Sequence, residues 1–159
     1  EYDEPLSIEA VDRPDPDPHG VVVQTEACGI CRSDWHAWKG HGEWADDQVP
    51  HGQILGHEPA GIVASVGDQV GEFSVGDRVA VPFSMGDGTC QYCRNGQGNV
   101  CEDGYALGFE PEAQGAFAEF LHVPEADYNL ETPVNDNDVE AFDVSTDSLT
   151  TFAAYLGVT

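Results

Sequence analysis

Two short segments of the chain combine a thiol, an imidazole and carboxylates at spacings that suit a metal site. They are Cys31-Arg-Ser33-Asp34-Trp-His36 and His57-Glu58. A thiolate and an imidazole on separate loops, with carboxylates close by, favour a zinc site that keeps one position open for water or substrate. The Ser33 hydroxyl and the His36 imidazole could pass a proton to solvent, and Asp34 could orient His57. Taken one at a time, a buried thiol and a surface histidine remain the alternative.

A second group of ligand types lies in a glycine-rich loop that has little else to fix its shape. Its members are Asp87, Cys90, Cys93 and Cys101. Aspartate is an acceptable oxygen ligand for zinc, so a site of three thiolates and one carboxylate is chemically possible, although weaker than four thiolates. The alternative is a metal-free lobe that contains three reduced thiols and the Asp87 carboxylate.

The composition excludes several classes of protein. The chain has 159 residues, with 30 Asp and Glu against 5 Lys and Arg and a net charge of −25. Nucleic acid and anionic lipid are poor partners for such a surface, and no apolar run is long enough to span a bilayer. Five cysteines without a signal peptide favour metal binding in the cytoplasm over disulfides. The dispersed carboxylates and the single lysine resemble proteins of halophiles, whose cytosol holds molar salt.

The elements that must position these residues are mainly strands. Gly, Pro and β-branched patterns predict strands at 21–23, 54–55, 61–67, 77–82 and 115–124, and helices at 33–38 and 147–156. Short strands separated by turn residues at this spacing favour a β-rich barrel or sandwich with short helices. The length suits a single domain that can bury its own core.

Three motifs together resemble a known family. They are Cys28-Gly-Ile-Cys31-Arg-Ser-Asp-x-His36, Gly56-His-Glu-Pro-Ala-Gly-Ile-Val63 and Phe73-Ser-Val-Gly-Asp-Arg-Val-Ala-Val81. In order and spacing they resemble the zinc-dependent medium-chain alcohol dehydrogenases, over nearly the whole chain. The resemblance implies that residues 1–159 form that family's catalytic domain, a mainly β fold with short helices built on a GroES-like β-barrel.

The resemblance also implies roles for individual residues. Cys31 and His57 would be ligands of the catalytic zinc, and Glu58 a neighbouring carboxylate that can approach it. Ser33 and His36 would form the proton relay, and Arg32 would contact the cofactor pyrophosphate. Family members with a structural zinc carry four cysteines where this chain has Asp87, Cys90, Cys93 and Cys101, so only the first ligand differs.

A third catalytic ligand is expected near residue 147. Family members place a cysteine or an aspartate four residues before a threonine that touches the nicotinamide, and Asp147 and Thr151 have that spacing. The resemblance therefore implies Asp147 as a zinc ligand and Thr151 as a cofactor contact. Alternatively, Asp147 is only the N-cap of the helix expected there, a position that favours aspartate.

The resemblance implies a function, but we expect these 159 residues alone to lack part of what it requires. The implied reaction is oxidation of a small alcohol to an aldehyde or ketone, and its reverse, with NAD or NADP, in an enzyme that would be a homo-oligomer. No G-x-G-x-x-G motif follows a strand, so we expect the Rossmann cofactor domain to be absent from these residues. A non-enzymatic zinc-binding module or an interaction scaffold is the alternative function.

Overall fold

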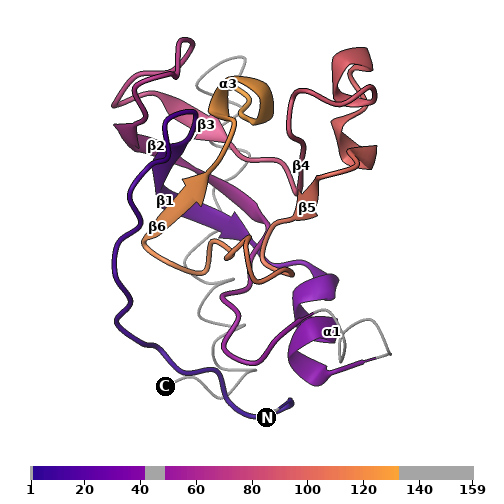
Figure 1. The fold of residues 1–159 in the computed structure, drawn as a ribbon. Helices are drawn as coiled ribbons and strands as arrows, with labels where there is room; N and C mark the ends of the chain where they lie inside the picture. The colour runs from indigo at the N-terminus through magenta and orange to yellow at the C-terminus, as the bar shows by residue number, and fades with distance from the viewer. Residues whose placement is uncertain (1, 42–48, 133–159) are drawn as a thin grey trace.

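The structure is a computed structural model, and it describes residues 2–41 and 49–132. Its main sheet has four antiparallel strands in the order β3-β2-β1-β6, with bounds β1 Val21–Gly29, β2 Glu58–Val66, β3 Arg78–Ala80 and β6 Phe120–Val123. β1 lies at the centre of this sheet and pairs with β2 along nearly all of its length (Figure 1). The prediction of a mainly β fold is confirmed.

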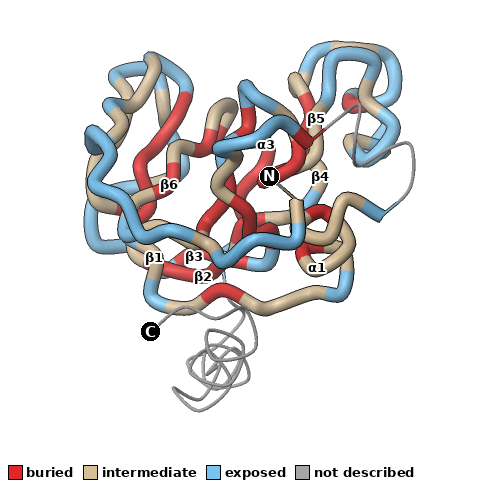
Figure 2. Tube along the Cα trace, turned by 90° about the horizontal axis from the view of Figure 1, so that it is seen from below, coloured by how far each residue is buried: buried red, intermediate tan, exposed pale blue. Residues whose placement is uncertain are grey.

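The shorter elements lie outside this sheet. Helix α1 spans Arg32–Lys39 and α3 spans Ala126–Asn129, while β4 Ser84–Met85 pairs with β5 Tyr105–Ala106. Between β4 and β5 the chain makes two 3-10 turns, η1 Cys93–Asn95 and η2 Gly98–Val100. Residues 86–104, which we call the cysteine lobe, project from the barrel in Figures 1 and 2. None of the helices in the described residues has the length and apolar run needed to span a bilayer.

The core forms where β-branched residues of the four strands meet. Val21, Val23, Val63 and Val123 are completely buried, and the buried segments concentrate on the strands in Figure 2. Val22 is also fully buried, so the first three residues of β1 contribute to the interior on both faces. Burying a large apolar side chain removes its surface from water and stabilises the barrel by about 1.5–3 kcal/mol.

Helix α1 agrees with its prediction, extended by one residue at each end. Its first turn is closed by Asp34, whose Oδ2 accepts a hydrogen bond from the Cys31 N–H at 2.9 Å. The helix ends at Gly40, which has a φ of 64° and donates its N–H to the Ala37 carbonyl. That left-handed conformation suits glycine, which has no Cβ to strain it.

Two strand predictions differ most from the structure. Residues 54–55 form no strand, and the strand expected over 115–124 is reduced to Phe120–Val123. The N–H groups of residues 115–117 bond to carbonyls of residues 54–56, whereas Phe120–Val123 pairs with β1. The first part of the segment pairs with residues 54–56 and the second part with β1. The chain therefore bends between these two parts, and neither pairing extends into a long strand ladder. The helix expected at 147–156 lies outside the described residues.

Candidate metal centres

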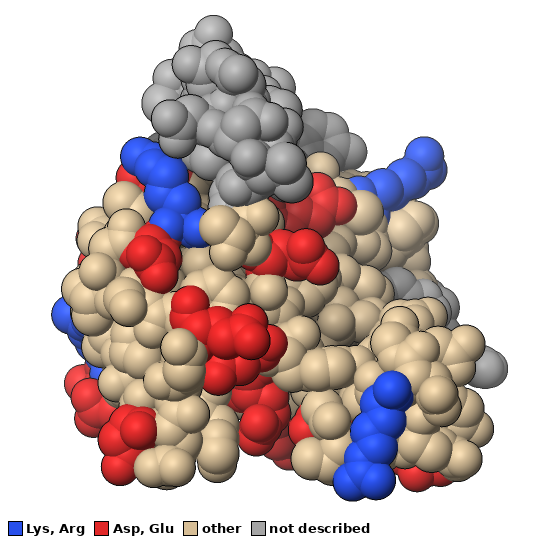
Figure 3. Space-filling model, turned by 90° about the horizontal axis from the view of Figure 1, so that it is seen from above, with Lys and Arg blue, Asp and Glu red and all other residues tan. Residues whose placement is uncertain are grey.

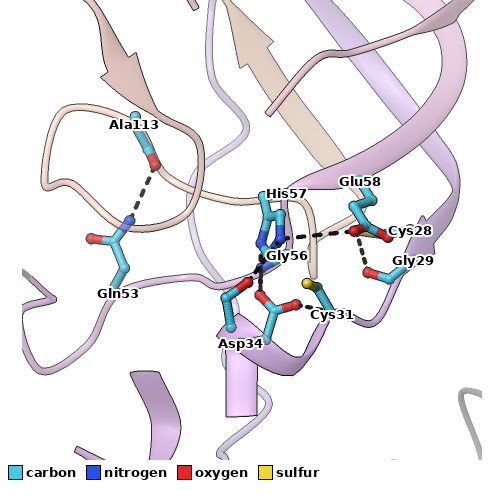
Figure 4. A network of polar contacts seen from close by, with 10 residues as sticks. Cys28, Gly29, Cys31, Asp34, Gln53, Gly56, His57, Glu58 and Ala113 are labelled. Atoms are coloured by element: carbon cyan, nitrogen blue, oxygen red, sulfur yellow. Dashed lines mark hydrogen bonds and ion pairs between the residues drawn. The ribbon is translucent and has the colours of Figure 1, made fainter. Parts of the chain in front are cut away.

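The first candidate centre lies where β1 leads into α1 and where β2 begins. Cys31 is the residue before α1, and His57 immediately precedes β2, so the antiparallel pairing of β1 with β2 brings them together. The ligand atoms of Cys31, His57 and Glu58 all lie within 4.8 Å of one another. Figure 4 shows these three side chains converging, with the Cys31 sulfur directed towards the other two.

Asp34 holds His57 in one orientation. Asp34 is completely buried, and its Oδ1 accepts hydrogen bonds from the Gly56 N–H at 3.0 Å and from His57 Nδ1 at 3.1 Å. Because Nδ1 carries the proton in this contact, Nε2 is the nitrogen left to bind a metal. The Ser33 hydroxyl lies 3.2 Å from that same Nε2.

Glycine at position 29 leaves room for the Glu58 carboxylate. Gly29 pairs with Glu58 across the β1–β2 ladder, and a Cβ at Gly29 would lie only 2.3 Å from Glu58 Oε2. Glu58 is half exposed, and its carboxylate approaches His57 Nε2 at 4.0 Å. The carboxylate can therefore approach the centre from the solvent side without being one of its fixed members.

The donor set and its spacing fit zinc. Zinc takes sulfur at about 2.3 Å and nitrogen at about 2.0 Å, so ligand atoms around it lie roughly 3.3–3.8 Å apart. The ligand atoms here all lie within 4.8 Å of one another, so they would need to close by at most about 1.5 Å to bind it. Burial works to lower the pKa of His57, but the hydrogen bond and charge of Asp34 outweigh it and raise that pKa. Hydrogen bonds from Ser33 lower the pKa of the Cys31 thiol, which favours the thiolate that a metal binds.

The two cysteines of this region should differ sharply in reactivity. Burial raises the pKa of Cys28 to about 12, whereas that of Cys31 is lowered. Since the thiolate is the reactive form, we expect iodoacetamide to modify Cys31 of the metal-free protein well below pH 9 and to leave Cys28 unmodified. Peptide mass spectrometry would measure both rates, with the protein unfolded in guanidinium chloride as the control. Equal rates in the folded protein would contradict the assignment.

Other predicted site residues lie around this centre. His36 Nδ1 lies 3.2 Å from His41 Nδ1, and both rings meet the edge of Trp35. Within the described residues no hydrogen bond joins Ser33 to His36, so the expected relay is not continuous through side chains of these residues. The Arg32 guanidinium lies 5.7 Å from the Trp35 ring. Asp147 and Thr151 lie outside the described residues.

Two aromatic side chains beside His57 were missed by the sequence analysis. The Phe83 ring lies 5.0 Å and the Phe109 ring 4.9 Å from the His57 ring. Phe109 is buried, whereas Phe83 remains 45% exposed, so it offers an apolar surface next to the centre. The available signal was that Phe83 directly follows the strand predicted at 77–82.

The second candidate centre is in the cysteine lobe. The ligand atoms of Asp87, Cys90, Cys93 and Cys101 all lie within 4.8 Å of one another. The sulfurs of Cys90 and Cys101 are 3.8 Å apart, which is the edge of a tetrahedron with zinc–sulfur bonds of about 2.3 Å. The Asp87 N–H donates to Cys101 Sγ and the Cys93 N–H to Cys90 Sγ, contacts that favour bound thiolates.

Asp87 has a structural task besides any metal contact. Its Oδ1 accepts hydrogen bonds from the N–H groups of Thr89 at 2.7 Å and Cys90 at 2.9 Å. These bonds hold the pKa of Asp87 well below its usual value, so the carboxylate is charged at neutral pH. The side chains of Cys93 and Thr89 also hydrogen bond to this carboxylate, and Oδ2, which accepts neither of the two backbone N–H groups, is the oxygen available to a metal.

The lobe is tied to the barrel by α3. The buried Asn129 side chain accepts from the Gly86 N–H and donates to the Gly86 and Pro124 carbonyls, at 2.9–3.0 Å. Tyr128 Oη donates to the Cys93 carbonyl at 3.3 Å. No feature of the sequence pattern singled out these two residues.

Comparisons with known proteins find relatives of this chain. Residues 17–133 match the family described as "Alcohol dehydrogenase GroES-like domain". An alcohol dehydrogenase of Geobacillus stearothermophilus is 36% identical over 156 residues, which cover 97% of this chain and 44% of the relative. The chain therefore spans less than half the length of this curated relative.

Two solved structures show the same fold. The alcohol dehydrogenase TADH from Thermus sp. ATN1 has a TM-score of 0.78 at 36% identity, over 90% of this chain and 41% of that one. A cobalt and zinc bound thermostable alcohol dehydrogenase from Pyrobaculum aerophilum has a TM-score of 0.70 at 27% identity, over 85% of this chain and 40% of that one. The GroES-like fold expected from the sequence is confirmed.

Proposed function

Because the chain belongs to the family of the alcohol dehydrogenase GroES-like domain, we propose that it forms the catalytic domain of a zinc-dependent alcohol dehydrogenase. The reaction is oxidation of a small alcohol to an aldehyde or ketone, and its reverse, with NAD or NADP. The observation that carries the proposal is the convergence of Cys31, His57 and Glu58, with His57 held by the buried Asp34. The cofactor is held mainly by residues outside these 159.

Each residue of the centre has a defined task in this proposal. Cys31, His57 and Asp147 hold zinc, and a bound zinc ion makes an alcohol hydroxyl more acidic by polarising it. Ser33, whose hydroxyl lies 3.2 Å from His57 Nε2, would accept the hydroxyl proton, and a bridging water would pass it to His36 and on to solvent, since no hydrogen bond of the described residues joins the two side chains. Arg32 binds cofactor phosphate and Thr151 contacts the nicotinamide.

Phe83 and Phe109 form an aromatic wall beside His57, and this wall favours small apolar alcohols. Phe83 is half exposed beside the imidazole of His57, and it packs edge to face on the buried Phe109. An alkyl group placed against Phe83 would lose apolar surface to the protein while its hydroxyl faces the metal ligands. The rings of Phe83 and Phe109 themselves offer no hydrogen-bond partner to the hydroxyl groups of a carbohydrate.

Zinc per chain, measured by mass spectrometry of the metal, tests the two centres. We expect about two zincs in the parent chain and one after Asp147→Ala. Asp87→Asn should remove the zinc of the cysteine lobe, because asparagine lacks the charge of the carboxylate. The turn itself should persist, because asparagine keeps an oxygen for the N–H groups of Thr89 and Cys90. Retention of both zincs in Cys31→Ser would contradict the catalytic centre.

Activity requires a cofactor domain. Joined to a nicotinamide-binding Rossmann domain of this family, the chain should reduce NAD or NADP with a small alcohol. Cys31→Ser should remove the activity, and Cys28→Ala is the matched control because that thiol lies outside the centre. A folded, zinc-loaded fusion that oxidises no alcohol would contradict the proposed function.

The proposal includes a halophilic cell and a reducing compartment such as its cytoplasm. All five cysteines are unpaired, as thiolate sites require, and Figure 3 shows Asp and Glu side chains spread over one face, with Lys and Arg at separate points around it. The longer protein is proposed to be a homo-oligomer that does not bind nucleic acid. Light scattering after size-exclusion chromatography would test the oligomer.

The charge predicts a strong dependence of stability on salt. A net charge of −25 repels itself over distances of about 30 Å in 0.01 M salt and about 3 Å in 1 M salt. We expect the melting temperature to rise by about 10 °C or more from dilute to molar potassium chloride, since each kcal/mol is worth a few degrees in a domain of this size. An unchanged melting temperature would contradict the halophile proposal.

A further inference from the structure

The cysteine lobe holds its candidate metal with unequal ligands. Three are sulfurs, but the fourth is Asp87, which already gives Oδ1 to two backbone N–H groups. Since thiolates bind zinc more strongly than a carboxylate does, this centre releases its metal more readily than four thiolates would. We propose that, when zinc leaves, Cys90 and Cys101 form a disulfide with a peroxide-class oxidant, which makes the lobe redox-sensitive. This inference rests on the proposed zinc content of the lobe.

The geometry selects Cys90 and Cys101 from the three thiols. Their sulfurs are 3.8 Å apart and need to approach by roughly 1.8 Å to reach the length of a disulfide bond. Both side chains are half buried and accessible to a small oxidant. Cys93 is only 3% exposed, and the Tyr128 hydroxyl donates a hydrogen bond to its backbone carbonyl. The least accessible thiol is therefore left out of the pair.

The lobe can accommodate the closure. The chain between the two cysteines consists of short 3-10 turns, η1 and η2, in which most residues are exposed. A movement of this size would leave the sheet and the α1 region in place, because the lobe projects from the barrel away from α1 in Figures 1 and 2. The catalytic centre can then keep its metal while the lobe changes state.

The chemistry balances with one peroxide for each disulfide. The thiolate of one cysteine attacks a peroxide oxygen, which breaks the O–O bond and gives a sulfenic acid and one water. The second thiolate attacks that sulfur, forms the S–S bond and releases a second water after protonation. Two thiols are oxidised and one peroxide is reduced. Zinc bound to both sulfurs draws electron density from them and makes them weaker nucleophiles, so bound metal slows the oxidation, and a disulfide no longer offers the metal two thiolates.

Tryptic digestion after oxidation of the full chain shows which cysteines have paired. Arg94 separates Cys93 from Cys101, and no Lys or Arg follows it, so cleavage gives peptides 79–94 and 95–159. Zinc-loaded and chelator-treated chains would be exposed to hydrogen peroxide, blocked with N-ethylmaleimide and digested without reduction. We expect the two peptides to be cross-linked in the metal-free chain. With zinc at ten times its dissociation constant, formation should slow about tenfold.

Variants distinguish this proposal from its alternatives. Cross-linking should persist in Cys93→Ser and disappear in Cys90→Ser, while Cys28→Ala should behave like the parent. Asp87→Cys should give protection at lower zinc concentrations. An internal disulfide between Cys90 and Cys93, sulfinic acids without cross-linking, or equal rates with and without zinc would overturn the proposal. The fusion assay of alcohol oxidation is independent of these readings, so either proposal can fail alone.

Discussion

Asp34→Asn should destabilise the domain by about 2–4 kcal/mol, although it changes one atom of a fully buried side chain. The carboxylate accepts three hydrogen bonds, from the backbone N–H groups of Cys31 and Gly56 and from His57 Nδ1. Asparagine offers one acceptor oxygen, and its NH₂ group must face either the Cys31 donor or the Gly56 and His57 donors. A buried donor is then left without an acceptor in both orientations.

The same substitution should weaken the first centre. Asparagine has no charge to hold the His57 Nδ1 proton, and it has no acceptor there when its NH₂ group faces His57, so His57 is less firmly oriented. Loss of such an orienting partner typically costs 10- to 100-fold in metal affinity. Denaturant unfolding would measure the stability, and competition with a zinc-binding dye the affinity of the first centre. The zinc of the cysteine lobe should be unaffected. We would count it in Cys31→Ser chains, whose first centre is empty, with and without Asp34→Asn.

Asp127→Asn is the matched control for the stability measurement. Asp127 also accepts two backbone hydrogen bonds, from Gly71 and Glu72, but it is exposed, so water can replace a lost partner. We expect a loss of about 1 kcal/mol or less there. Equal losses in the two variants would contradict the argument that burial of Asp34 makes its hydrogen bonds costly.

The parts that could be predicted from the sequence are those set by local spacing. Cys31, Ser33 and Asp34 lie within one turn of a helix start, so their spacing alone brings Asp34 Oδ2 to the Cys31 N–H. The glycine, proline and β-branched patterns located β1, β2 and β3 because each strand is bounded by turn residues. The roles of the site residues remain predictions that the zinc measurements address.

The remaining features depend on contacts between distant residues. The segment 115–117 pairs with 54–56 rather than continuing β6, and a strand pattern in the sequence does not show a change of partner. Phe83 meets His57 only because β2 and β3 are neighbours in the sheet. Asn129 reaches Gly86 across 43 residues, and a single asparagine in a polar segment carries no signal of such a contact.

Asn129→Asp should loosen the cysteine lobe from the barrel. Asn129 is only 5% exposed, and its amide donates to the Gly86 and Pro124 carbonyls while its oxygen accepts from the Gly86 N–H. Aspartate keeps the acceptor, loses both donors and places a charge against two carbonyl oxygens. We expect a loss of about 2–4 kcal/mol in the free energy of unfolding, measured by denaturant titration.

The loss in Asn129→Asp should be concentrated in the lobe. Amide hydrogen exchange of residues 86–104 should accelerate more than that of β1, because the broken contacts connect the lobe to α3 rather than strand to strand. Asn95→Asp is the matched control, since the Asn95 amide makes a single exposed hydrogen bond to the Gln91 carbonyl. Uniform acceleration across β1 and the lobe would show that Asn129 stabilises the whole barrel. That result would contradict the argument that its hydrogen bonds hold only the lobe in place.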